Sequence, residues 1–172
     1  MKSLGIALLC LLGTLAWAQE LEKLVQVEEP IPEEENPLPI FLPTYSTDDF
    51  SLSASSKLNW FQAEAACASQ GGYSLVTLDS EDKQNRVFLF LLNSGYLNLL
   101  NEPIWTSGSN LASASLWSWF STGAAFKYRH FQTTPNTSYR CLGLNALDGY
   151  WIPQDCNAQR YFVCEKRCQE IE

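Results

Sequence analysis

The chain has 172 residues and a formal net charge of −8. The acidity is concentrated near the N-terminus: residues 19–43 carry seven glutamates and one lysine, whereas residues 44–168 carry ten acidic and nine basic residues. Non-specific nucleic-acid binding depends on clustered positive charge, and this distribution gives it no support, so we expect no nucleic-acid partner.

Residues 1–18 have the features of a secretory signal peptide. Lys2 supplies a positive start, residues 4–15 are an apolar stretch too short to cross a bilayer, and residues 16–18 (Ala-Trp-Ala) form a small-x-small cleavage site. We therefore expect a secreted, extracellular protein whose mature chain begins at Gln19, with an uncleaved membrane anchor as the alternative. No later apolar run is long enough for a membrane span.

Residues 19–44 are predicted to form an acidic linker rich in proline and glutamate. Its glutamates repel one another and its prolines restrict the backbone, so both residue types oppose packing into a core. We interpret the segment as a solvated spacer, with a docking tail for a partner as the alternative.

Two helices are predicted from their start and stop signals. Asn59 followed three residues later by Gln62 matches a capping box, and two glycines at 71 and 72 end the helix that it opens. Ser80, followed by two acidic residues that complement the helix dipole, opens the second helix, which ends at Gly95.

The rest of the chain favours short strands separated by polar loops. We expect strands at residues 73–78, 104–106, 116–119, 141–145 and 161–164. Trp117 and Trp119 alternate across Ser118, so one can face inward and one outward, and a core role is favoured over a ligand platform. Two helices with short strands predict an α+β domain over residues 45–168, followed by a short tail at 169–172.

The mature chain contains five cysteines, which are Cys67, Cys141, Cys156, Cys164 and Cys168. Secreted proteins fold in an oxidising compartment, so disulfides are expected. The first four allow three connectivities, and their spacing does not choose among them. Cys168 is a candidate for an interchain bridge in a disulfide-linked dimer, for capping by a small thiol, or for a free thiol.

A set of motifs in a fixed order gives this domain a family resemblance. The motifs are Asn59-Trp60-Phe61-x-Ala63-x-x-x-Cys67, Leu75-Val76-Thr77-Leu78-x-Ser80, Trp105-Thr106-Ser107-Gly108, Trp117-Ser118-Trp119 and Tyr161-Phe162-Val163-Cys164-Glu165. Residues 45–166 therefore resemble a C-type lectin-like domain, most similar to the small secreted single-domain lectins of invertebrates.

The resemblance implies a disulfide-braced fold with two helices, short antiparallel strands and a long loop region. It also implies the pairings Cys67–Cys164 and Cys141–Cys156. The first pairing would close a loop of roughly 100 residues, which stabilises a protein by about 4.7 kcal/mol in the chain-entropy model.

The positions that would bind calcium in this family are altered here. Calcium-dependent members carry Glu-Pro-Asn or Gln-Pro-Asp before the third cysteine and Trp-Asn-Asp before the fourth. This chain has Thr134-Pro135-Asn136 and Trp151-Ile152-Pro153 instead, and Asp148 and Asp155 cannot make a cage alone. Calcium requires six to eight oxygen ligands, so we expect no calcium and no other metal or cofactor.

A mixture of aromatic and basic residues near the third cysteine is the candidate ligand-binding site. These residues are Lys127, Tyr128, Arg129, His130, Asn136, Tyr139, Arg140 and Tyr150. Flat rings can stack on sugar C–H faces, and arginine can pair with sulfate or carboxylate. The same residue types also anchor protein partners. Asn136 starts an Asn-Thr-Ser sequon and is a candidate for glycosylation.

Catalysis has little support, because the chain has one histidine, His130, and none of the metalloprotease, paired-cysteine zinc or phosphate-loop motifs. We therefore expect a protein that is not an enzyme and that binds glycans without the usual calcium site. The alternative is an extracellular protein-binding module of immune or reproductive fluid that has lost sugar recognition.

Overall fold

The computed structural model of the protein describes residues 43–135 and 138–167. Several predicted features lie outside these residues: the signal peptide at 1–18, all but the end of the linker at 19–44, Asn136, Cys168 and the tail at 169–172. Within the described ranges, no helix has the length and apolar character that crossing a membrane requires.

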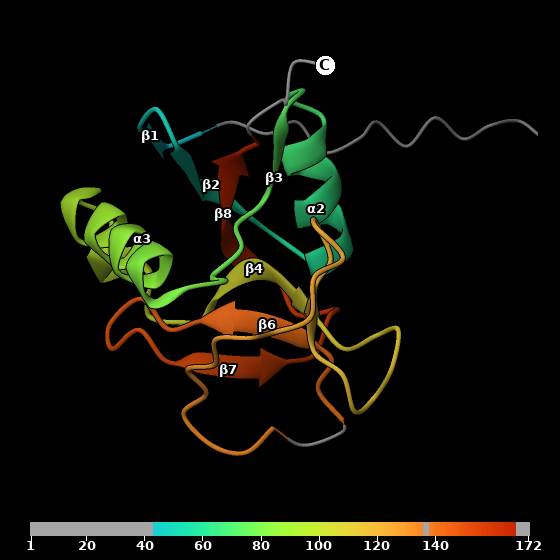
Figure 1. Ribbon diagram of the computed structural model, residues 1–172. Helices are drawn as coiled ribbons and strands as arrows, with labels where there is room; N and C mark the ends of the chain where they lie inside the picture. The colour runs from blue at the N-terminus through green and yellow to red at the C-terminus, as the bar shows by residue number, and fades with distance from the viewer. Residues whose placement is uncertain (1–42, 136–137, 168–172) are drawn as a thin grey trace, which may run out of the picture. The chain divides into compact units, whose positions relative to one another are not determined.

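The domain is built on one sheet with two α-helices, α2 (Trp60–Ala68) and α3 (Glu81–Asn93). The strands are β1 (Tyr45–Ser46), β2 (Phe50–Leu58), β3 (Tyr73–Leu75), β4 (Ile104–Ser109), β5 (Ser118–Trp119), β6 (Cys141–Leu144), β7 (Trp151–Gln154) and β8 (Arg160–Lys166), and a 3-10 turn, η1, spans Leu97–Leu99. The strand order is β1-β2-β8-β4-β6-β7, with β3 paired to β8 and β5 to β4 (Figure 1). The predicted α+β class with two helices is confirmed.

Both helices begin at the caps that the sequence predicts. The Asn59 side chain accepts a hydrogen bond from the Gln62 backbone N (2.9 Å), and the Gln62 side chain accepts one from the Asn59 backbone N (3.2 Å). Ser80 Oγ accepts from the Lys83 backbone N (3.3 Å) at the start of α3. Just beyond the end of α3, Gly95 has a φ of 77°, a conformation that only glycine adopts readily.

Three strands were not predicted, namely the two-residue strand β1 and the longer strands β2 and β7. The β2 strand pairs with β8. Phe50, Leu52 and Ala54 alternate with serines, which is the period-2 pattern of a strand, but the serines make the segment as a whole weakly hydrophobic, so the pattern was not recognised. The β7 strand contains Pro153, which disfavours a central strand but is tolerated here because β7 ends the strand order. The predicted strands all exist, with boundaries shifted by no more than three residues.

The core of the domain is dominated by aromatic side chains. Trp117 and Trp119 are both buried, so the expectation that one of them faces outward is wrong and the favoured core role is correct. Phe126 explains the difference: its ring lies 4.1 Å from that of Trp119 and 5.9 Å from that of Trp117, so it packs against both.

Two disulfides brace the fold with the pairing that the family resemblance implies. Cys67 of α2 is joined to Cys164 of β8 across 97 residues of sequence, and Cys141 at the start of β6 is joined to Cys156 across 15 residues. The first bridge fixes α2 against the sheet, and the second fixes β6 to the segment that follows β7.

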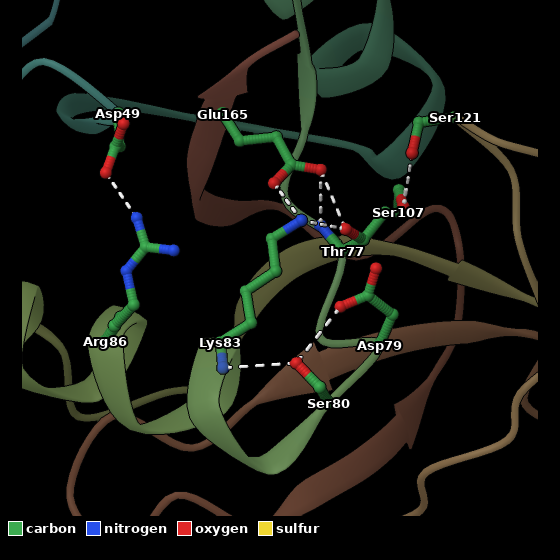
Figure 2. Close-up of polar contacts among 9 residues, drawn as sticks. All are labelled: Asp49, Thr77, Asp79, Ser80, Lys83, Arg86, Ser107, Ser121 and Glu165. Carbon is green, nitrogen blue, oxygen red and sulfur yellow. Dashed lines mark hydrogen bonds and ion pairs between the residues drawn. The ribbon is translucent and has the colours of Figure 1, made fainter. Parts of the chain in front are cut away.

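A polar cluster connects α3 to the sheet (Figure 2). Lys83 Nζ lies 2.5 Å from Glu165 Oε2 and also donates to Thr77 Oγ1. Glu165 Oε1 accepts from the backbone N (3.1 Å) and the hydroxyl (2.8 Å) of Thr77. The neighbouring pair of Arg86 and Asp49 also joins α3 to the sheet side, but it is exposed.

Glu64 of α2 is a half-buried acid whose charge is poorly satisfied. Burial raises the pKa of its carboxyl from 4.5 to about 7, although a hydrogen bond from the Leu75 backbone and the charge of Arg167 oppose this. One of its carboxylate oxygens, Oε2, has no hydrogen-bond partner. The folded protein therefore favours the protonated form of Glu64.

This preference predicts a pH-dependent stability. A raised pKa stabilises the fold fully below the unfolded value of 4.5, and this contribution is lost as the pH rises through about 7. The loss from this group amounts to at most about 3 kcal/mol. Urea denaturation at pH 5 and pH 8 measures it, and Glu64→Gln is expected to remove most of the difference. Equal pH dependence in both proteins would contradict this account.

Candidate functional site

The segment 126–132 runs along the outer edge of the sheet beside β7. The Trp151 backbone N donates to the carbonyl of His130 (2.9 Å), and the Gln132 backbone N donates to the carbonyl of Trp151 (3.2 Å). On its other side β7 pairs with β6, where Trp151 lies opposite Leu144. These bonds fix the backbone of a segment that carries half of the predicted ligand-binding residues.

Three rings form an aromatic stack on this edge, namely Tyr128, His130 and Tyr150. The His130 and Tyr150 rings are 4.8 Å apart and 7° from parallel, and the Tyr128 and His130 rings are 6.2 Å apart and 10° from parallel. Tyr128 also meets the buried Trp151 edge-on at 5.5 Å. Tyr150 is 40% exposed, whereas Tyr128 and His130 are half-buried, so Tyr150 presents the most accessible ring.

A buried glutamine holds the stack in place from α3. Gln84 Oε1 accepts from the Trp151 indole N (2.7 Å), and Gln84 Nε2 donates to the carbonyl of Gly149 (2.6 Å). Asp148 fixes the next residue, because its Oδ1 accepts from the Tyr150 backbone N (3.0 Å). Sequence reasoning missed Gln84, although a polar residue on the buried face of α3, alongside Val87, was a usable signal.

Charge around the stack is uneven. Burial raises the pKa of Tyr128, and the negative charge of Glu81 at the start of α3 adds to the rise. Lys127 and Arg129, which flank Tyr128, are exposed, and neither takes part in an ion pair with another described residue.

The remaining candidate residues lie elsewhere. Arg140 donates from Nε to Asn110 Oδ1 (2.9 Å) and from a terminal nitrogen to the carbonyls of Asn110 (2.5 Å) and Leu111 (3.1 Å). It therefore holds a neighbouring loop, with the exposed Tyr139 beside it. Both residues precede β6 at the end opposite Leu144, so the structure does not bring them to the stack. Asn136 lies outside the described residues.

Among the residues that the structure describes, the donors near β7 do not fit a calcium ion. Ile152 and Pro153 occupy two positions where the family's oxygen ligands would stand, and both are paired into the sheet with β6. The Asp148 carboxylate is engaged by Tyr150 and Asn145, and Asp155 Oδ1 accepts from Asn157. Among the described residues, no group of three or more histidine, cysteine or acidic side chains could hold a metal.

Known proteins match this chain over most of the described residues. The family model described as "Lectin C-type domain" matches residues 56–166. Lithostathine-2 of Mus musculus is 29% identical over 116 residues, covering 64% of this chain and 65% of that protein, so the match leaves about a third of the relative uncovered. The galactose-specific lectin nattectin of Thalassophryne nattereri is 26% identical over 113 residues, covering 63% and 68%.

A solved structure agrees with these matches. A calcium-independent type II antifreeze protein superposes with a TM-score of 0.56 at 26% identity, covering 72% of this chain and 89% of that one. The fold of this chain thus has a counterpart in a solved structure. These matches do not single out the invertebrate members that the sequence resembles.

Proposed function

The chain belongs to the C-type lectin domain family, and we propose that it is a secreted, extracellular protein that binds glycans without the family's usual calcium ion. One of its relatives, nattectin, is described as a galactose-specific lectin, which supports glycan binding over catalysis. The observation that carries the proposal is the aromatic stack of Tyr128, His130 and Tyr150, held at the edge of the sheet beside β7.

The stack has the properties of a sugar-binding platform. The accessible face of Tyr150 can pack against the C–H face of a pyranose ring, while the polar groups of Tyr150 and His130 offer hydrogen bonds to its hydroxyls. Because Gln84 and Asp148 fix the backbone at Gly149 and Tyr150, little conformational entropy is lost when a ligand binds. A fixed ring also binds with a defined orientation.

Three observations support a site that works without calcium. Alkyl side chains replace two of the family's oxygen ligands, at Ile152 and Pro153. The acid at Asp148 already serves to order the turn before β7. In addition, a solved structure with 26% identity to this chain is described as a calcium-independent type II antifreeze protein, which supports the proposal that this fold can act without the ion.

We expect binding on a glycan array to be the same with and without a chelator, and Tyr150→Ala to weaken it about tenfold, equivalent to about 1.4 kcal/mol. The matched control is Tyr139→Ala, which removes an exposed tyrosine at the other end of β6. Thermal unfolding of each variant checks that the fold is retained.

Each contrary result has a definite meaning. Chelator-sensitive binding would restore the ordinary calcium-dependent mechanism. Equal losses of glycan affinity in Tyr150→Ala and Tyr139→Ala would show that the aromatic stack is not the sugar-binding platform. A blank array would reject glycan binding and favour a protein-binding module.

A further inference from the structure

The segment beside β7 separates its aromatic and its basic side chains. Phe126 is buried and Tyr128 and His130 are half-buried, whereas Lys127 and Arg129 are exposed. The even-numbered residues therefore pack toward Trp151 and the stack, and the two cations between them face water.

These two charges are not used by the fold. The ion pairs of the described residues engage Lys57, Lys83, Arg86 and Arg160, and Arg140 is bonded to its neighbouring loop. Residues 126–140 contain no acid in the sequence. Unpaired cations on an acid-free segment create a local positive potential that attracts anions.

Acidic groups also lie near the stack. Glu81 opens α3 and lies close enough to Tyr128 to affect its pKa, and Asp148 lies in the turn that Gln84 of α3 holds through Gly149. An anionic group would be repelled by these acids and attracted by Lys127 and Arg129, so its preferred place is beside the two cations.

We propose that Lys127 and Arg129 are the anion-binding half of the site, and that the preferred ligands are glycans carrying a sulfate or carboxylate next to the sugar ring that stacks on Tyr150. This inference rests on the proposed glycan binding. The Arg129 guanidinium can bind either group through two parallel hydrogen bonds, and Lys127 adds a point charge. Because both side chains are exposed, their contribution is screened by salt.

The test measures the affinity of the full secreted chain for three oligosaccharides of the same length. These are a sulfated glycosaminoglycan fragment, its desulfated counterpart that keeps the carboxylates, and a neutral glycan. We expect the sulfated ligand to bind about tenfold more tightly than the neutral one at low salt, with the ratio falling as salt rises from about 50 to about 300 mM. Lys127→Ala/Arg129→Ala should reduce that ratio to near one.

A charge-matched control separates a site from general attraction. Lys166→Ala/Arg167→Ala also removes two exposed cations, at the end of β8, which β4 and β6 separate from β7. The ratio is expected to be unchanged in this variant.

The desulfated ligand distinguishes sulfate from carboxylate recognition, and preference for either supports the inference. Equal affinities for charged and neutral glycans, or equal effects of the two double variants, would overturn it while leaving glycan binding intact. Failure to bind any glycan would overturn both.

Discussion

Replacing Cys67 and Cys164 together by alanine is expected to lower the free energy of unfolding by about 4.7 kcal/mol, because the unfolded chain regains the entropy of a long loop. The same change at Cys141 and Cys156 should cost about 3 kcal/mol, since that bridge closes a much shorter loop. The sequence separations of 97 and 15 residues set the order of the two effects.

Urea denaturation of the two double variants and the native protein measures both losses under one set of conditions. The two pairs form a matched comparison, because each replaces a disulfide between largely buried cysteines by the same pair of small side chains. A larger loss for the short loop would show that strain or local packing, and not loop entropy, controls the contribution of these bridges.

Replacing Glu165 by glutamine is expected to destabilise the protein by about 3 kcal/mol. The side chains of Lys83 and Glu165 are only 21% and 10% exposed, so the variant leaves a lysine charge largely withdrawn from water without its counter-charge. The backbone N and the hydroxyl of Thr77 both donate to the Glu165 carboxylate. In the variant they could still donate to the amide oxygen of the glutamine, but this acceptor carries no charge. Lys83→Met/Glu165→Gln should recover part of the loss, because it removes the stranded charge.

The exposed ion pair between Arg86 of α3 and Asp49 provides the control for this prediction (Figure 2). Asp49→Asn removes the charge that pairs with Arg86. The side chains of Asp49 and Arg86 are 60% and 49% exposed, so the variant is expected to change stability by less than about 1 kcal/mol. Chemical denaturation of the variants decides the matter. Similar losses of stability for Glu165→Gln and Asp49→Asn would show that the burial of the Lys83–Glu165 pair does not increase its contribution to stability.

Local signals allowed the helices and the cysteine framework to be predicted. The capping residues Asn59 and Ser80 act within a few residues of sequence, so their effect is readable without the fold. The disulfide pairing was implied by family resemblance, since spacing alone left three options open. By contrast, β2 was missed because its burial depends on pairing with β8, more than 100 residues away in sequence.

The candidate site shows the same division between local and long-range information. Composition was enough to place Tyr128, His130 and Tyr150 among the candidates, but their parallel stacking depends on the backbone bonds between segment 126–132 and β7. Arg140 resembled its basic neighbours in the sequence, yet its partners Asn110 and Leu111 lie about 30 residues earlier. Only the tertiary fold distinguishes a structural arginine from a free one.

The strand order determines how this domain can be attached to anything else. Residues at both ends of the described domain lie in β1, β2 and β8, at one end of the strand order, whereas β7 and the aromatic stack lie at the other (Figure 1). Phe50 is paired directly with Glu165, so the entry and exit of the chain are neighbours. A tag, a surface linkage or a second protein joined directly at either end of the described domain would therefore start from the side away from the stack, and the domain could be immobilised there with its binding edge facing outward.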